Sequence, residues 1–337
     1  MLARKNGSMS ISEIAKHLNV SKSTVSLVIN GKAEEGRISK ASAQRIRDYI
    51  EEIGYKPNAL AKSLATGKSR TIGLIVENIG DSFFGPIALH IEEYLRKHEY
   101  QVLYSSTMGD NTLAAEIVQT MLEKQVEGII LAPTDAMRTE VEHMLKSKVP
   151  LVLFDRKIPN VQTNYVGTDN YEASRQAVEH LLQQGYERIG MVTIDSQQPQ
   201  MQDRLRAYRE VLSEDGREEQ LLYVSFLARS GDPVDAITKW LKKNPQIDGV
   251  FFSTNYVCIA GLKAMRKLDR EQTLGVITFD DLEVLELMRP QISCVRQPLE
   301  KIAKAVVQML IEQLNDRDKP FNEKIIKSKL QIRESSL

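Results

Sequence analysis

The spacing of hydrophobic residues divides the chain into two unlike stretches. Up to about residue 54, apolar side chains recur every three or four positions, which is typical of short amphipathic helices. After residue 70, short apolar runs rich in β-branched residues alternate with helical patterns. The first stretch therefore predicts a small all-α head, and the second predicts an α/β body.

Three helices are predicted in the head, and each begins after a serine. Ser10 precedes the first, and Glu13 stands three residues later, which is the arrangement of a capping box. Ser21 and Ser39 are good N-caps for the second and third helices, because a serine hydroxyl accepts a hydrogen bond from a first-turn backbone amide. Leu18-Asn19-Val20 can make the tight turn between the first two. This arrangement predicts a helix-turn-helix, whose second helix enters a DNA major groove.

The residues of the second helix separate into a buried and an outward side. Val25, Val28 and Ile29 form the buried side. The outward residues near its start are Lys22, Ser23, Ser26 and Leu27. An N-terminal end of this kind suits contact with base edges and phosphates.

Charge supports the DNA-binding interpretation. The first 70 residues hold 13 Lys and Arg against six Asp and Glu, a net charge of +7. The whole chain is neutral, so residues 71–337 carry −7. A basic head on a mildly acidic body is typical of a protein that binds a polyanion. From the helical pattern alone, a three-helix bundle with a solvated basic face is the alternative.

The body shows the pattern of parallel sheets covered by helices on both faces. The runs predicted to be strands are Thr71–Glu77, Gln101–Ser106, Gly128–Ala132, Leu151–Asp155, Ile189–Ile194, Gly249–Ser253 and Gly275–Asp280. Helical patterns lie near 84–98, 112–125, 137–147, 170–184, 202–214, 233–243, 257–268 and 299–314. This set is long for one sheet, and a change of pattern near Tyr165–Asp169 predicts two lobes.

Composition narrows the class of protein. A hydrophobic content of 42% with 27% charged residues is ordinary for a globular protein. No window approaches the roughly 18 apolar residues of a membrane span, and no secretory signal is recognisable at the N-terminus. Cys258 and Cys294 lack metal-site partners and are interpreted as reduced structural thiols, so we expect a cytoplasmic protein without a cofactor or metal.

The sequence contains no recognisable catalytic motif. There is no HExxH, GxSxG or dinucleotide fingerprint after a strand. The five histidines are scattered over predicted helices and are interpreted as surface or packing residues: His17, His90, His98, His143 and His180. We therefore expect a binding protein rather than an enzyme.

The head resembles the amino-terminal signature of the lactose-repressor (LacI/GalR) family of bacterial transcription regulators. The matching residues are Ile14-Ala15, Val20-Ser21, Ser23-Thr24-Val25-Ser26, Asn30-Gly31 and Gly54-Tyr55-x-Pro57-Asn58-x-x-Ala61. Markers similar to the family's continue through the body: Asp81-Ser82-Phe83-Phe84, Gly128-Ile129-Ile130, Phe154-Asp155-Arg156, Val166-x-x-Asp169-Asn170, His180-Leu181-x-x-x-Gly185-Tyr186-x-x-Ile189, Phe279-Asp280-Asp281 and Val295-x-Gln297-Pro298. The resemblance thus covers essentially the whole chain.

The resemblance implies a domain organisation. It consists of a helix-turn-helix domain (1–56), a hinge helix or linker (57–69), an N-terminal lobe (70–168 with 298–325) and a C-terminal lobe (169–297 with 326–337). The two lobes look like those of periplasmic sugar-binding proteins, in which ligand binds between them. In the family, the hinge helix folds on DNA and inserts a leucine into the minor groove. Leu64 matches that leucine, and Ala61 matches the small residue beside it.

Pattern and resemblance together assign two sets of site residues. Those expected to contact DNA are Ser10, Ser21, Lys22, Ser23, Thr24, Ser26, Leu27, Asn30, Tyr55, Asn58, Ala61 and Leu64. Several relatives carry a base-contacting arginine at the position of Leu27, so a different operator base is expected there. Those expected to bind the effector, at strand ends and in the loops that follow, are Phe83, Phe84, Asp155, Arg206, Asn255 and Asp280.

The identity of the effector stays open at this point. Carboxylates and amides suit sugar hydroxyls, and the two phenylalanines suit the face of a sugar ring. Tyr256 stands where the family commonly has aspartate, which puts the ligand in doubt. Arg156-Lys157 beside the cleft is compatible with a sugar acid or sugar phosphate, and equally with a solvated loop.

The predicted function is that of a ligand-responsive repressor. A homodimer would read a roughly palindromic operator, since protein and DNA symmetry match. No heptad tail follows Ile332, so we expect dimers, located in the bacterial cytoplasm at the nucleoid. Two alternatives remain: a regulator controlled by a protein coregulator, and a sugar-binding protein of a transport system.

Overall fold

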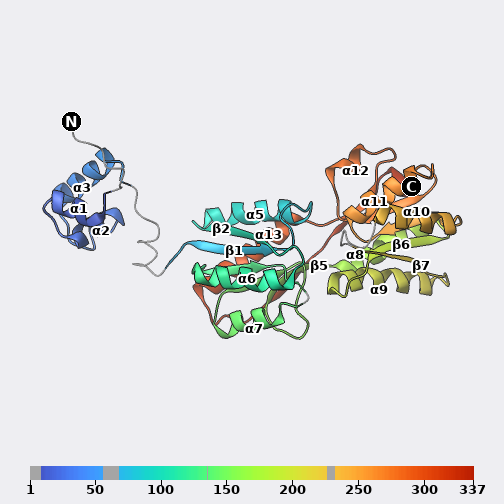
Figure 1. Ribbon diagram of the computed structural model, residues 1–337, viewed down its shortest axis with the longest axis horizontal. Coiled ribbons are helices and arrows are strands. Elements are labelled where there is room, and N and C mark those ends of the chain that lie inside the picture. Colours follow the sequence, from blue (N-terminus) through green and yellow to red (C-terminus); the bar gives the residue numbers. More distant parts are fainter. Residues whose placement is uncertain (1–8, 56–67, 135, 226–231) are drawn as a thin grey trace. The chain divides into compact units, whose positions relative to one another are not determined.

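The computed structural model describes residues 9–55, 68–134, 136–225 and 232–337. The chain forms two compact units that divide between Ser69 and Arg70 (Figure 1). The first is the helical head, and the second is the α/β body.

The head contains the three predicted helices, α1 (Ile11–His17), α2 (Lys22–Ile29) and α3 (Lys40–Glu52). Each begins after the predicted N-cap, so Ser10, Ser21 and Ser39 all accept a hydrogen bond from a first-turn amide. The capping box is confirmed as well, because the Glu13 carboxylate accepts from the Ser10 backbone amide at 2.7 Å. Ile14, Val25, Val28, Ala43 and Ile46 meet in a small buried core.

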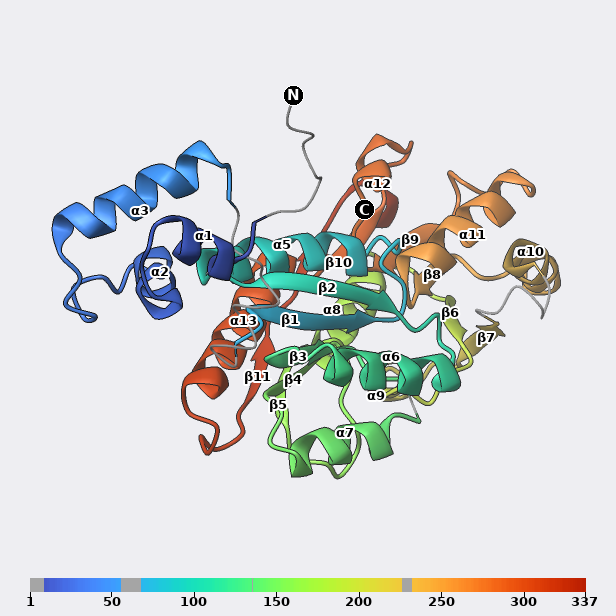
Figure 2. The same ribbon diagram turned by 60° about the vertical axis from the view of Figure 1, so that its left-hand side comes forward.

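The first lobe of the body is built on a six-stranded parallel sheet. Its strands are β1 (Thr71–Val76), β2 (Gln101–Ser106), β3 (Gly128–Leu131), β4 (Leu151–Phe154), β5 (Asn164–Thr168) and β11 (Glu323–Ile326). They lie in the order β11-β5-β4-β3-β1-β2, as the fan of strands in Figure 2 shows. β1 therefore sits beside both β2 and β3, and the sheet reverses its direction of winding there.

Helices cover both faces of this sheet. They are α5 (Phe84–Lys97), α6 (Asn111–Glu123), α7 (Arg138–Lys146) and α13 (Leu299–Asn315). Ile72, Leu74 and Val76 of β1 face the layer of α5 and α13, whereas Ile75 faces the layer of α6 and α7. This alternation follows from the two-residue period of a strand, and it buries both sides of β1.

The second lobe repeats the same plan. Its strands are β6 (Ile189–Ile194), β7 (Gln220–Val224), β8 (Gly249–Phe252), β9 (Gly275–Phe279), β10 (Ser293–Arg296) and β12 (Lys329–Gln331). Their order is β12-β10-β9-β8-β6-β7, and only the β10–β12 pair among these described strands is antiparallel. The helices are α8 (Asn170–Gln183), α9 (Pro199–Glu214), α10 (Pro233–Lys243), α11 (Asn255–Arg266), the short α12 (Glu283–Leu287) and a 3-10 turn, η2 (Glu334–Ser336).

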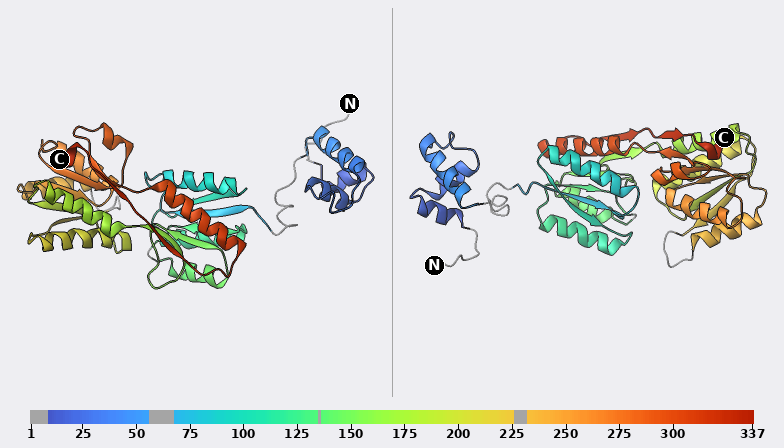
Figure 3. Two further views of the ribbon diagram at one scale, coloured as in Figure 1. Left: turned by 180° about the vertical axis from the view of Figure 1, so that it is seen from behind. Right: turned by 90° about the horizontal axis from the view of Figure 1, so that it is seen from above.

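The chain passes between the lobes at three places. It crosses after β5 near Thr168, returns before α13 near Gln297, and crosses again between β11 and β12. Figure 3 shows the last two crossings as red segments that run side by side. The C-terminal segments therefore complete one sheet each, β11 in the first lobe and β12 in the second.

Every predicted strand and helix of the body is present, but five strands were not predicted. They are β5, β7, β10, β11 and β12. β11 is mostly exposed and β12 is three residues long, so neither carries the continuous apolar run that marks a buried strand. The edge strand β7 is likewise only partly buried. The pairing of β7, β11 and β12 is decided by the neighbouring strand rather than by their own sequence.

Candidate functional site

The start of α2 exposes two side chains that take no part in capping the helix. Lys22 and Ser23 are exposed. By contrast, Ser21 Oγ caps the helix and lies 2.8 Å from Thr24 Oγ1. At the other end, Asn30 Nδ2 donates to the Ser26 carbonyl at 2.8 Å. Of the residues assigned to DNA contact on α2, Lys22 and Ser23 are thus the most available, and the others also hold the helix in shape.

Three further residues assigned to DNA contact also make contacts within the head. Leu27 is half-buried and lies against the backbone of Gly36, where a Cβ would meet Leu27 Cδ1 at 2.6 Å. The Ser10 hydroxyl donates to the Glu13 carboxylate, so it serves the cap of α1. Tyr55 packs against the core of the head. Asn58, Ala61 and Leu64 lie outside the described residues, and their predicted roles stay predictions.

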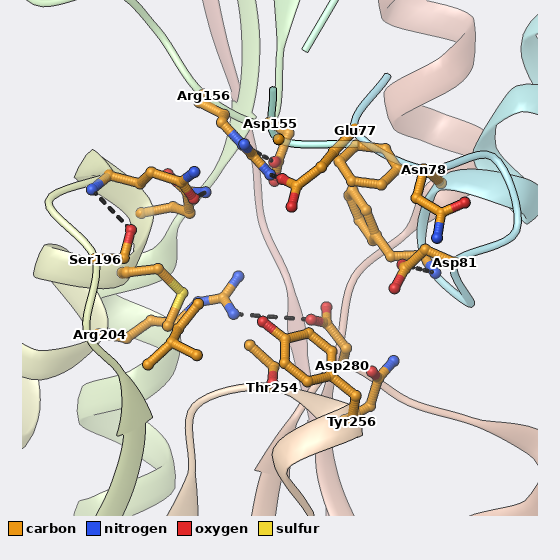
Figure 4. A pocket seen from close by; sticks show the side chains of 18 of the residues that line it. Glu77, Asn78, Asp81, Asp155, Arg156, Ser196, Arg204, Thr254, Tyr256 and Asp280 are labelled. Carbon is orange, nitrogen blue, oxygen red and sulfur yellow. Dashed lines mark hydrogen bonds and ion pairs between the residues drawn. The ribbon is translucent and has the colours of Figure 1, made fainter. Parts of the chain in front are cut away.

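A cavity of about 440 Å³ lies in the body, with walls from both lobes. The first lobe contributes Glu77, Asn78, Asp81, Phe83, Phe84, Gly109, Asp155 and Arg156. The second contributes Ile194, Asp195, Ser196, Gln197, Gln198, Gln200, Met201, Arg204, Thr254, Asn255, Tyr256 and Asp280, with Gln297 from the crossover. Figure 4 shows Glu77 and Arg156 facing Arg204 and Asp280 across the opening.

The position of the cavity follows from the winding of the sheets. Glu77 follows β1 and Asp195 follows β6, the strands at which each sheet reverses its winding. In open α/β sheets the crevice at the carboxyl ends of such strands is the usual ligand site. Asp155 after β4 and Asp280 after β9 enter the cavity in the same way, and both have left-handed backbones, with φ of 64° and 68°. Aspartate tolerates this conformation, and it turns each carboxylate out of its strand.

Arg156 forms a buried charge cluster on the side of the first lobe. Its Nη2 lies 2.6 Å from Glu77 Oε2, and its Nε lies 3.1 Å from Asp155 Oδ2. Burial acts to lower the pKa of Arg156, but the two carboxylates outweigh it and raise the pKa overall. Arg156 therefore stays charged and holds both carboxylates in fixed positions.

Arg204 forms the corresponding cluster on the side of the second lobe. Its side chain is 3% exposed, and Nη1 lies 3.7 Å from Asp280 Oδ2. Nη1 also donates to the Ser253 carbonyl at 2.7 Å, and Nε donates to Asn170 Oδ1 at 3.0 Å. The guanidinium carbon lies 3.5 Å from the centre of the Phe279 ring. Burial raises the pKa of Asp280, and Arg204 acts in the opposite direction.

Arg206, which the sequence assigned to effector binding, does not line the cavity. Arg206 points to solvent, pairs with Asp203 at 2.9 Å and covers the ring of Tyr171. Arg204 lies two positions earlier, about 200° away around α9, and it is the arginine that lines the cavity. The sequence contained the signal, since Met201, Arg204, Leu205 and Tyr208 follow the spacing of one helix face.

Aromatic residues form one wall of the cavity. Phe83 and Phe84 both line it, as expected, with their rings packed edge to face at 5.1 Å. Phe84 also packs against Phe154 of the core, so the pair is held rigidly. Tyr256 lines the opposite side, and burial raises its pKa to about 12. The phenol therefore stays protonated and can donate a hydrogen bond.

Polar contacts join the cavity to the connection between the lobes. Asn255 Nδ2 donates to Ser82 Oγ of the other lobe at 3.1 Å. Gln297 Nε2 donates to Asp280 Oδ1 at 2.6 Å, and its Oε1 accepts from Thr168 Oγ1 at 2.9 Å. Thr168 and Gln297 stand at two crossovers. Asp280 is consequently connected by hydrogen bonds to two of the segments that join the lobes.

Five of the six predicted effector residues line this cavity: Phe83, Phe84, Asp155, Asn255 and Asp280. The residues that were not predicted include Glu77, Gln200, Arg204 and Gln297. Glu77 comes directly after the first strand of the body, so the strand-end rule that found Asp155 could have found it. No such signal in the sequence identifies Gln200, because the turn before α9 decides where its side chain points.

The chemistry of the cavity is that of hydrogen bonding and charge. Its lining contains no histidine, cysteine or lysine. Within the described part of the chain, no three histidine, cysteine, aspartate or glutamate side chains are grouped to hold a metal ion. The arrangement can hold a small polar molecule between an aromatic wall and a set of carboxylates and amides.

Comparison with known proteins places this architecture. Residues 10–58 match the profile of bacterial regulatory proteins of the lacI family, and residues 72–319 match that of the periplasmic binding protein domain. The HTH-type transcriptional regulator PtxS of Pseudomonas plecoglossicida is 32% identical, over 99% of this chain and 98% of its own length. The chain belongs to the lacI family of bacterial regulatory proteins. It is a DNA-binding transcription regulator of that family and not an enzyme.

Solved structures agree with the fold. The Lac repressor dimer bound to operator and the anti-inducer ONPF has a TM-score of 0.86 at 17% identity, over 98% of this chain and 100% of the other. The complex of the transcriptional regulator CelR with cellobiose has a TM-score of 0.71 at 24% identity, over 97% and 99%. No helix among the described residues of this regulator is long and apolar enough to cross a membrane.

Proposed function

We propose that this lacI-family regulator is a homodimeric repressor whose operator affinity is set by a sugar-like effector in the cavity between the lobes. The observation that carries the proposal is that one cavity takes polar walls from both lobes of a body joined to a helix-turn-helix head. The Lac repressor structure contains a dimer on operator DNA, and the CelR structure contains cellobiose. Their fold is the fold of this chain. We expect the regulator to act in the bacterial cytoplasm, at the nucleoid.

Operator recognition is assigned to the start of α2. The exposed Lys22 and Ser23 are free of the capping bonds that occupy Ser21 and Thr24, so they are the side chains proposed to reach phosphates and base edges. A dimer would place two such helices in successive major grooves of a nearly palindromic site. Phosphate contacts would position the helix, and base contacts would specify the sequence.

Effector control follows from the shape of the cavity. A ligand in the cavity would contact Arg156 and Phe83 on one lobe and Arg204 and Asn255 on the other. Such a ligand binds one arrangement of the two lobes more tightly than another. It can change operator affinity only by that difference in affinity between the two arrangements. Hydrogen bonds from Asp280 to Gln297 and from Gln297 to Thr168 connect the cavity to two of the crossovers, so a ligand that contacts Asp280 can influence the position of these segments.

The test is selection of operator sequences by the full-length chain from a randomised duplex pool, followed by affinity measurements from about 50 to about 200 mM salt. We expect a nearly palindromic site and a steep loss of affinity with salt. Lys22→Ala should reduce the slope of log affinity against log salt by about 0.9, the value of one phosphate contact. Lys124→Ala, an exposed lysine of the body, is the matched control and should leave the slope unchanged. Absence of salt-dependent DNA binding would overturn the proposal.

A further inference from the structure

The charges that line the cavity do not balance. Among the described residues that line it, five carboxyl groups face two guanidinium groups, a formal net charge of −3. The carboxylates belong to Glu77, Asp81, Asp155, Asp195 and Asp280, and the guanidinium groups belong to Arg156 and Arg204. In Figure 4 the carboxyl groups of Glu77, Asp81 and Asp280 point toward the middle of the cavity.

Both arginines already have their partners in the protein. Arg156 is held by Glu77 and Asp155, which carry two charges against its one. Arg204 is held by Asp280, the Ser253 carbonyl and Asn170. Neither arginine is thus a spare cation for an anionic ligand. Lys157, which the sequence suggested as a further cation beside the cleft, pairs with Glu323 at 3.0 Å and does not line the cavity.

The carboxylates, in contrast, retain capacity to accept hydrogen bonds. Asp81 Oδ1 accepts from the Phe83 amide at 2.7 Å in the turn before α5, and none of the ion pairs among the described residues joins a lysine or arginine to this carboxylate. A carboxylate has about four acceptor positions, so one turn bond leaves most of them open. Asp81, Asp155 and Asp280 line the same cavity, and the pKa of Asp280 is raised by burial and further by the negative charge of the other two.

A buried amide oxygen gives an independent indication. Gln200 lines the cavity and is only 6% exposed, and no residue in the described part of the chain donates a hydrogen bond to its Oε1. Its Nε2 is occupied by Gln198 Oε1 at 3.0 Å. A buried acceptor without a donor is costly, so a ligand that donates to this oxygen gains affinity from it.

We propose that the cavity binds a polyhydroxylated compound that is uncharged or carries an ammonium group, and that it excludes sugar acids and sugar phosphates, with Asp81 as the residue that sets this preference. Hydroxyl and ammonium groups donate hydrogen bonds, which the surplus of acceptors requires. A carboxylate or phosphate would place further negative charge beside carboxylates that have no cation to spare. The proposal rests on the proposed function only in taking this cavity as the effector site.

The experiment measures binding to the full-length chain with ligand series that differ only in charge. Each series contains a sugar, its amino sugar, its sugar acid and its phosphate, for example glucose, glucosamine, glucuronate and glucose 6-phosphate, with matching sets for other hexoses and for pentoses. Thermal unfolding finds the series that binds, and calorimetry gives the affinities. Within that series we expect the neutral and ammonium members to bind, and the acid and phosphate to bind at least about a hundredfold more weakly.

The variant Asp81→Asn tests the residue. It should reduce the preference for the amino sugar over the neutral sugar by about tenfold, because a charged hydrogen bond is replaced by a neutral one. Glu116→Gln makes the same change of charge on the exposed face of α6 and is the control that should leave the preference unchanged. Equal effects of the two variants would remove Asp81 from the proposal.

The outcomes separate this inference from the proposed function. If an acid or a phosphate is the member that binds and releases the operator, the charge inference is overturned and the proposed function stands. If a neutral or amino sugar binds without changing operator affinity, the inference stands and effector control fails. If no member of any series binds, both are overturned, and a protein coregulator becomes the alternative to test.

Discussion

Removal of the Arg204 guanidinium should destabilise the second lobe far more than removal of the guanidinium two residues later. Arg204→Ala leaves the Asp280 carboxylate buried beside other carboxylates, without its ion pair at 3.7 Å. It also removes the donors to the Ser253 carbonyl and Asn170 and the packing on Phe279. Breaking a buried pair from one side typically costs about 3–5 kcal/mol of unfolding free energy. For Arg206→Ala, whose ion pairs are exposed, the expected cost is below about 1 kcal/mol.

The assay is urea unfolding followed by tryptophan fluorescence. The chain has a single tryptophan, Trp240, which lies on α10 in the same lobe as Arg204, so the signal reports the lobe in question. The two variants are matched, because they delete the same side chain from the same helix. Equal losses for Arg204→Ala and Arg206→Ala would refute the reasoning, since buried and exposed ion pairs would then contribute alike.

The pH dependence of this loss adds a second check. Burial raises the pKa of Asp280 in the folded state, so the folded chain binds this proton more tightly than the unfolded chain. The resulting contribution to stability is complete below the unfolded pKa of about 3.9 and is lost as pH rises through the folded value. Without Arg204 the pKa should rise further. The deficit of Arg204→Ala relative to wild type should therefore grow with rising pH and shrink in acid.

Three further predictions concern the head, the thiols and the core. Leu27→Arg should change the operator base preferred at one position of each half-site, because arginine donates to guanine and leucine cannot; an unchanged selection profile would count against a base contact there. Burial raises the pKa of Cys258 to about 12, and it raises the pKa of Cys294 as well. At a pH of about 8.5, where an ordinary thiol is half ionised, both thiols should therefore resist alkylation until urea unfolds the chain. Gly261→Ala should cost about 1–3 kcal/mol by urea unfolding, because the new Cβ would lie 2.2 Å from the Phe252 ring; a neutral result would show that the ring can move aside.

The sequence predicted the elements whose formation is local. The three helices of the head begin after Ser10, Ser21 and Ser39 because a cap acts on the next turn of the same segment. Six of the seven predicted strands carry apolar runs that are buried on both faces, whereas β2 lies at the edge of its sheet and is only partly buried. The strand-end rule likewise placed Asp155 and Asp280 at the cavity, because a parallel strand always delivers its carboxyl end to the same edge of the sheet.

Tertiary structure decided what depends on partners distant in sequence. β11 and β12 have little burial of their own and form strands because β5 and β10 offer free edges to pair with. The choice of Arg204 over Arg206 depends on which face of α9 meets the second sheet. The unbalanced charge of the cavity arises only when carboxylates from four separate segments, those after β1, β4, β6 and β9, are brought together, and no local sequence pattern adds them up. Local propensity and periodicity act within one segment, whereas packing depends on all segments together. For that reason the sequence predicted five residues that line the cavity, but the fold determined the charge of the cavity.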